Sequence, residues 1–97
     1  MSFIQIIEAR AENLDALLAL DAEWRAATEG KRTARRAIVT TDRNDPTRRL
    51  IIVFFDSYES AMENSALPET QAVAEQYSKM SDGPPVFYDL DVLEDRA

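Results

Sequence analysis

The feature that most constrains this sequence is a six-residue apolar run, LIIVFF, at residues 50–55. Six residues are too few for a stable helix, and the run is rich in β-branched and aromatic side chains, which favour strands. Because successive strand side chains point to opposite faces of a sheet, this strand is apolar on both faces. A chain of 97 residues with two helical regions can cover one of those faces. We expect a second copy of the chain to cover the other.

The composition is that of one globular domain spanning residues 1–97. Apolar residues make up 45% of the chain and charged residues 30%, which is too hydrophobic for a disordered protein. No segment approaches the roughly 18 apolar residues that a membrane span requires. The first residues lack the basic and apolar segments of a secretory signal. We therefore expect a cytoplasmic protein that makes no membrane contact.

The chain contains neither cysteine nor histidine. The first absence excludes disulfides and thiolate chemistry, and the second removes the commonest general base and the commonest transition-metal ligand. A Ser-His-Asp triad and a histidine-ligated zinc or haem cannot be built. Acid–base chemistry would fall to Asp, Glu, Lys, Arg or Tyr, and we expect neither a cofactor nor a bound metal.

The net charge of −7 is unevenly distributed. Eight of the 11 basic residues lie in residues 25–49, where only three acids occur, so this segment carries +5 and the remainder −12. A basic segment can follow phosphates, but this one contains no aromatic residue for base stacking. We expect no nucleic-acid binding, and we expect these cations to meet acidic neighbours within the subunit or across an interface.

Local signals mark the ends of three helices. Asn13 is a predicted N-cap, and Gly30 follows the expected end of the first helix at residues 14–28. Asp56 and Glu59 have capping-box spacing and predict a short helix through Met62, which Asn64 and Ser65 interrupt. Pro68 suits the first position of a longer helix that reaches about residue 80.

Strands are predicted at residues 3–9, 33–41, 48–55 and 86–93, with a turn at residues 42–47 whose proline cannot continue a ladder. The order is therefore β-α-β-β-α-β. Right-handed crossovers make this an α+β, ferredoxin-like antiparallel sheet with its helices on one face. Dimerisation through the helix-free face would produce a dimeric α/β barrel.

Asp21 lies near the middle of the apolar face of the first helix. At about 100° per residue, that face comprises Leu14, Leu17, Leu18, Leu20 and Trp24. A buried carboxylate must find a partner, become protonated or contact water. It could pair with Arg25 or with an arginine of the second strand. It could instead act as a pocket acid or base, with Trp24 as a flat wall, or the helix could be rotated enough to expose it. Asp21 is thus the candidate catalytic residue.

Two tyrosines could add polar groups near Asp21. Tyr77 shares a helix face with Val73 and Met80. Tyr88 shares one face of the last strand with Val86, Leu90 and Val92, and we assign this face to the helix side of the sheet. Buried phenolic hydroxyls need partners, although ordinary core packing can also satisfy them. The candidate ligand-binding residues are therefore Asp21, Trp24, Arg25, Tyr77 and Tyr88.

The other face of the last strand carries Asp89 and Asp91, which this assignment places on the helix-free face. We expect interfacial salt bridges to Arg35 or Arg36. A divalent metal held by the two carboxylates is the alternative, since oxygen ligands suit magnesium and calcium.

The sequence FDSYESAM at residues 55–62 directly follows the predicted third strand. It resembles the strand-to-helix junction, with an S-x-E-A pattern, of dimeric α/β-barrel proteins in the antibiotic biosynthesis monooxygenase-like superfamily. The resemblance implies a homodimer with a ligand cavity between sheet and helices in each subunit. It also implies small aromatic, quinol-like or polyketide-like ligands and, in some members, cofactor-independent oxygenase activity. Versions of this chemistry that depend on histidine are not available to this chain.

The alternative to an oxygenase is a non-catalytic dimeric module that binds a metabolite or a protein partner. Amino-acid-sensing domains share the element order, but they place glycine between the first strand and helix, where this chain has ARAEN. RNA-recognition domains flank aromatic residues of the third strand with glycine, which residues 48–55 lack. The sequence leaves open whether the protein is an enzyme.

Overall fold

The computed structural model describes residues 2–97, which form a four-stranded sheet and three helices. In chain order the elements are β1 (Phe3–Arg10), α1 (Leu14–Ala27), β2 (Arg36–Asp42), β3 (Asp45–Phe55), α2 (Tyr58–Ala66), α3 (Pro68–Met80) and β4 (Val86–Asp91). The strand order is β2-β3-β1-β4, and every neighbouring pair is antiparallel. The predicted ferredoxin-like α+β fold is confirmed.

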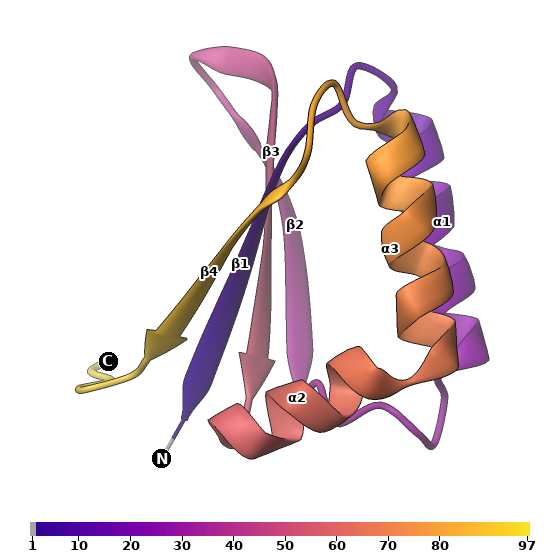
Figure 1. Ribbon diagram of the computed structural model, residues 1–97. Helices are drawn as coiled ribbons and strands as arrows, with labels where there is room; N and C mark the ends of the chain where they lie inside the picture. Colours follow the sequence, from indigo (N-terminus) through magenta and orange to yellow (C-terminus); the bar gives the residue numbers. More distant parts are fainter. Residues whose placement is uncertain (1) are drawn as a thin grey trace.

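All three helices lie to one side of the sheet (Figure 1). Helices α1 and α3 lie alongside each other and face the sheet, whereas α2 crosses near the end of β3. The opposite side of the sheet carries no helix, and we call it the helix-free face. None of the helices in residues 2–97 has the length and apolar content needed to cross a membrane.

The alternating burial of the β3 side chains confirms that its apolar run contributes to both faces of the sheet. Ile51, Val53 and Phe55 are buried and contribute to the core under the helices, whereas Ile52 and Phe54 are only partly buried. The rest of the core comes mainly from β1 and the helices, with Phe3, Leu17, Leu20, Ala61 and Tyr77. Leu14 and Leu18 lie at the margin of the apolar face of α1, 37% and 44% exposed.

The helix ends agree with the sequence except at the two ends of α2. The Asn13 side chain accepts a hydrogen bond from the Ala16 amide, and Pro68 occupies the first turn of α3, as predicted. The capping box predicted for Asp56 and Glu59 is wrong. Ser57 and Ser60 form it instead, each side chain accepting from the other's backbone N–H at 3.1 Å. Hydroxyls at this spacing satisfy the same two free N–H groups that a capping box serves.

The predicted break of the helix near Asn64 is also wrong, because α2 continues to Ala66. Asn64 turns inward, where its Oδ1 accepts the Thr33 backbone N–H at 3.2 Å. Pro46 lies within β3 rather than in a turn before it. The pairing of β2 with β3 shifts register at Thr41–Asp42, and proline is tolerated at such irregularities.

The assignment of faces on β4 is the main error of the prediction. Tyr88 pairs with Ile6 and Leu90 with Ile4, whereas Phe3 and Ile7 point into the core beneath the helices. Directly paired residues share a face, so Tyr88 and Leu90 lie on the helix-free face. The apolar side of β4 therefore belongs to the face that the helices leave uncovered.

Candidate functional site

A small cavity lies between the sheet and the helices. It has a volume of about 80 Å³, and its polar lining comes from four elements. The polar side chains that reach it include Gln5 of β1, Asp21 of α1, Asn64 of α2, and Thr70 and Tyr77 of α3. Buried β3 side chains, among them Ile51 and Val53, form its apolar floor. We call this space the inner cavity.

A larger pocket of about 370 Å³ opens beside the inner cavity, between α3 and strands β1 and β4. Phe87 and Pro85 contribute to its outer wall. The two spaces share the lining residues Gln5, Ile7, Ser65, Thr70 and Tyr77. A ligand in the outer pocket would therefore contact the same tyrosine and glutamine that line the inner cavity.

Trp24 forms one wall of the inner cavity and is held in place by a hydrogen bond. Its indole Nε1 donates to Thr70 Oγ1 at 2.9 Å, which joins α1 to α3. A buried indole N–H needs such a partner. The bond orients the indole ring, which lines the inner cavity.

Asp21 forms an ion pair with Arg25, which is the first of the three alternatives predicted for the Asp21 carboxylate. Arg25 Nε lies 3.1 Å from Asp21 Oδ2, one helical turn away, and the Asp21 side chain is 15% exposed. The third alternative, a rotated helix that exposes Asp21, is wrong. Asp21 also lines the inner cavity, so pairing does not remove it from the site. Arg25 does not line the inner cavity, and its side chain lies on the β2 side of α1.

Tyr77 is buried against the core and lines both spaces. Burial raises the pKa of its hydroxyl far above the usual range, and the nearby Asp21 carboxylate raises that pKa further. Both effects disfavour the phenolate. At neutral pH, Tyr77 can thus donate a hydrogen bond to a ligand oxygen but cannot act as a general base.

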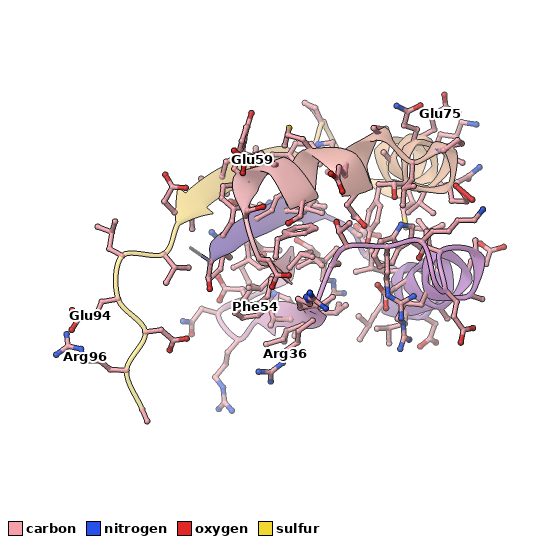
Figure 2. All side chains as sticks on the ribbon, turned by 90° about the horizontal axis from the view of Figure 1, so that it is seen from below. Arg36, Phe54, Glu59, Glu75, Glu94 and Arg96 are labelled. Carbon is pink, nitrogen blue, oxygen red and sulfur yellow. The ribbon has the colours of Figure 1, made fainter. Side chains whose placement is uncertain are left out.

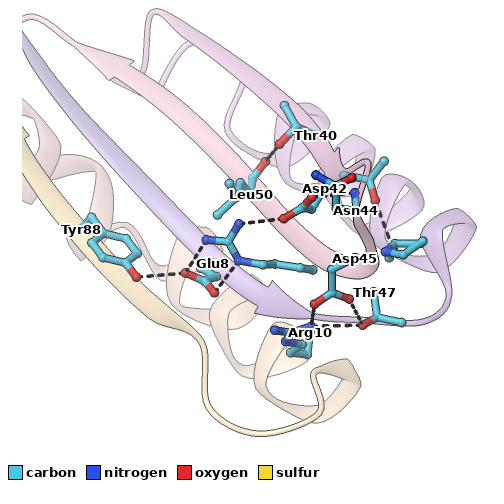
Figure 3. Close-up of polar contacts among 12 residues, drawn as sticks. Glu8, Arg10, Thr40, Asp42, Asn44, Asp45, Thr47, Leu50 and Tyr88 are labelled. Carbon is cyan, nitrogen blue, oxygen red and sulfur yellow. Dashed lines mark hydrogen bonds and ion pairs between the residues drawn. The ribbon is translucent and has the colours of Figure 1, made fainter.

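Tyr88 is separated from the other candidates by the sheet. Its hydroxyl donates to Glu8 Oε1 at 2.9 Å, and Arg48 Nε donates to Glu8 Oε2 at 2.9 Å (Figure 3). Arg48 also donates to Asp42 Oδ2 at 3.1 Å. The bond to Arg48, and then the bond to Tyr88, lower the pKa of Glu8. The proposed role of Tyr88 beside Asp21 is therefore wrong, and its network lies on the helix-free face.

The predicted salt bridges of Asp89 and Asp91 are also absent from this subunit. Asp89 accepts a hydrogen bond from Gln5 Nε2 at 3.2 Å, and Arg35 donates to Asp56, with its Nε 2.9 Å from Oδ2. Both aspartates lie on the helix side of β4, so they do not reach the helix-free face. Within residues 2–97, no group of three acidic side chains is arranged to hold a metal ion.

Gln5, Asn64 and Thr70 are site residues that the sequence analysis missed. Asn64 is 5% exposed and lines the inner cavity, and its Oδ1 accepts from the Thr33 backbone N–H. A buried asparagine within a helix is unfavourable by propensity, and this is a signal in the sequence. Gln5 and Thr70 carry no comparable signal.

Comparison with solved structures identifies the architecture. Rv0793 from Mycobacterium tuberculosis superposes with a TM-score of 0.82 at 14% identity, covering 100% of both chains. A provisionally named antibiotic biosynthesis monooxygenase from Chloroflexus aurantiacus J-10-fl gives 0.74 at 20% identity, covering 100% of this chain and 98% of the other. Another from Deinococcus radiodurans gives 0.78 at 15% identity, covering 100% and 97%.

This chain shares its fold with proteins named as antibiotic biosynthesis monooxygenases. The comparison thereby confirms the ferredoxin-like α+β fold expected from the sequence. No family model matches the sequence, and no curated protein does. Within this fold, the structure brings Asp21, Trp24 and Tyr77 to one cavity between helices and sheet.

Proposed function

We propose that this protein binds a small, largely apolar ligand in the inner cavity and the pocket beside it, and that it does so as a homodimer. The observation that carries the proposal is the convergence of Asp21, Trp24, Asn64 and Tyr77, from three helices, on one space with an apolar floor. Such a lining, apolar with a few convergent polar groups, is typical of small-molecule sites. The expected ligands are aromatic or polyketide-like, and the expected location is the cytoplasm.

The polar groups suit a ligand that carries a carbonyl or phenol oxygen. The Tyr77 hydroxyl and the Asn64 amide are donors, whereas Asp21 is the single carboxylate at the inner cavity. Asp21 is thus the group that can accept a proton from an acidic phenol or an activated C–H of the ligand. Trp24 provides a flat surface for an aromatic ring.

In the oxygenase form of this proposal, an activated ring methylene reacts with one O₂. The carbon becomes a carbonyl and loses both hydrogens, one oxygen atom enters the product, and the other leaves as water. The ligand supplies all four electrons, so no external reductant is needed. Asp21 accepts the first proton, and the donors hold the developing oxyanion.

The proposed dimer forms through the helix-free face. Strand side chains of this face are apolar at most positions, namely Ile4, Ile6, Ile38, Leu50, Ile52, Phe54, Val86, Tyr88 and Leu90. Val86, Tyr88 and Leu90 are between 42% and 48% exposed in the single subunit. Contiguous apolar surface of this kind is typical of protein interfaces rather than of a free monomer.

Ligand binding is testable through Trp24, the only tryptophan of the chain. Titration with 1-naphthol and with anthrone should change its fluorescence, and the Tyr77→Phe variant should weaken the binding of both. Tyr58→Phe is the matched control, because Tyr58 is 50% exposed on α2 and lies outside the cavity. Equal affinities for wild type and Tyr77→Phe would contradict the proposed site.

A non-catalytic module is the second candidate function. The absence of histidine and the pairing of Asp21 with Arg25 favour it, because both reduce the capacity for general-base catalysis. Oxygen uptake with anthrone distinguishes the oxygenase from the binding module. Uptake that Asp21→Asn abolishes supports the oxygenase, whereas ligand binding without uptake across a panel of anthrones and quinols supports the binding module.

A further inference from the structure

A second hollow lies on the other side of Trp24, between α1 and the edge strand β2. It has a volume of about 420 Å³ and a floor of small and branched apolar residues, including Leu18, Ala37 and Val39. Its charged lining consists of a single acid, Asp21, and four arginines, namely Arg25, Arg32, Arg35 and Arg36. We call this hollow the arginine groove.

The positive charge of the arginine groove is only partly compensated. Arg25 pairs with Asp21 and Arg35 with Asp56. Arg32 and Arg36 have no carboxylate partner among residues 2–97. Four of the eight cations of the basic segment pair with acids, namely Arg25, Lys31, Arg35 and Arg48. Arg36 is directly paired with Phe54 in the sheet, so its guanidinium lies on the helix-free face, and Arg32 provides the uncompensated guanidinium at the groove.

Both unpaired arginines are held against aromatic rings. The Arg32 guanidinium carbon lies 5.8 Å from the centroid of the Trp24 ring, and its Nη1 donates to the Arg25 carbonyl oxygen at 2.7 Å. The Arg36 guanidinium lies 5.7 Å from the Phe54 ring, at the end of the sheet seen in Figure 2. A guanidinium oriented in this way loses less conformational entropy when it binds a carboxylate with its remaining donors.

We propose that the arginine groove binds a small organic anion, a carboxylate on a flat apolar body, with the carboxylate at Arg32 and the body on the apolar floor. The apolar floor disfavours a fully hydrated inorganic anion, and a volume of about 420 Å³ suits a small molecule. This site goes beyond the proposed ligand cavity, since it faces β2 and depends on Arg32, which does not line the inner cavity. Trp24 and Asp21 line both spaces.

The test uses 1-naphthoate as the probe and the uncharged 1-naphthalenemethanol as its matched control, both titrated into the full chain by calorimetry. Wild type should bind the carboxylate at least about tenfold more tightly than the alcohol, since a charge-assisted hydrogen bond contributes about 1.5 to 3 kcal/mol. Arg32→Gln should remove this preference, whereas Arg32→Lys should retain part of it. Arg43→Gln, which removes a positive charge from the exposed turn outside the groove, should have no effect.

Three results would overturn the proposal: no saturable binding of 1-naphthoate, equal affinity for the acid and the alcohol, or an Arg32→Gln affinity equal to that of wild type. Tyr77→Phe separates this site from the cavity, because it should leave naphthoate binding unchanged. If Tyr77→Phe weakens naphthoate as much as Arg32→Gln does, the probe occupies the cavity and the groove assignment is wrong. The Arg36 guanidinium lies against Phe54 on the helix-free face, so the test relies on Arg32. Thermal melts of each variant verify that it is folded.

Discussion

The two faces of the sheet are built from the same kinds of residue and meet different surroundings. Ile51 and Ile52 are neighbours in β3, yet Ile51 is 3% exposed beneath the helices, whereas Ile52 lies on the helix-free face and is only partly buried. The same contrast separates Phe55 from Phe54. Because both members of each pair are strongly apolar, the difference lies in what covers them and not in their chemistry.

This contrast indicates that the chain carries more apolar surface than its own helices cover. The helix-covered face is closed by the helices except at the inner cavity, the pocket beside it and the arginine groove. The helix-free face is mainly apolar, with a polar network at one end, where Arg48 bonds to Glu8 and Asp42. In the proposed function, the first face binds a ligand in the space left in its core, and the second face binds a second copy of the chain.

The largest expected effect distinguishes Ile51 from Ile52. Ile51→Ala should lower the free energy of unfolding by about 2 to 5 kcal/mol, because it opens a cavity in the packed core. Ile52→Ala should cost less, and its cost should grow with protein concentration if a partner covers the residue. Urea denaturation at two protein concentrations measures both. Equal, concentration-independent losses would remove the distinction between the faces.

Arg49 and Arg48 are a second adjacent pair that divides between the faces. Arg49 is 6% exposed, and it donates to the Ala11 carbonyl at 3.0 Å and to Thr41 Oγ1 at 2.6 Å. Arg49→Leu leaves these acceptors unsatisfied, so it should lower the free energy of unfolding by about 1 to 3 kcal/mol. Arg48→Leu should cost less at neutral pH, because its ion pairs are partly solvated. Thermal denaturation compares them, and a larger loss for Arg48→Leu would contradict this order.

The Arg48 network also predicts a pH dependence. Hydrogen bonds to Arg48 lower the pKa of Glu8, and a bond from the Asn44 backbone, followed by Arg48, lowers the pKa of Asp42. A depressed folded-state pKa stabilises the protein above the unfolded-state pKa, and this stabilisation is lost as the pH falls through the folded-state value. The melting temperatures of wild type and Arg48→Leu should therefore converge on acidification below the ordinary carboxyl values of 4.5 and 3.8. Parallel curves down to low pH would contradict the assignment.

The smallest expected effect on stability is that of Asp21→Asn. Its partner Arg25 is 57% exposed, and such pairs contribute about 1 kcal/mol or less. Its effect on ligand binding or turnover should be larger, because Asp21 is the only carboxylate at the inner cavity. Parallel thermal melts and Trp24 fluorescence titrations measure the two effects. A variant that is destabilised but binds ligand normally would remove Asp21 from the site.

The sequence predicted what depends on local periodicity. Helical spacing places Asp21, Trp24 and Arg25 within about one turn of one another, and strand alternation assigns Ile51 and Ile52 to opposite faces. The face of Tyr88 was not predictable in this way. It depends on the register of β4 against β1, and that pairing joins residues 78 to 88 positions apart.

The site was only partly predictable for a related reason. Gln5 and Thr70 reach the cavity because elements far apart in the sequence meet there, and neither residue stands out within its own segment. Asn64 carries a signal, but from the sequence a polar residue at this position predicts a helix break as readily as an inward-facing side chain. Ser57 replaced Asp56 as the N-cap because a hydroxyl one residue later formed the reciprocal bonds, while Asp56 paired with Arg35.

The mass of the protein in solution, measured by sedimentation velocity over a range of concentrations, tests directly whether a second copy covers the helix-free face. We expect a particle of about 22 kDa, twice the chain mass of 11.0 kDa. We also expect Ile52→Glu to shift the protein to the monomer, because a carboxylate buried in an apolar interface costs several kcal/mol. A wild-type chain that stays at 11.0 kDa at every concentration would contradict the claim that a second copy covers the helix-free face.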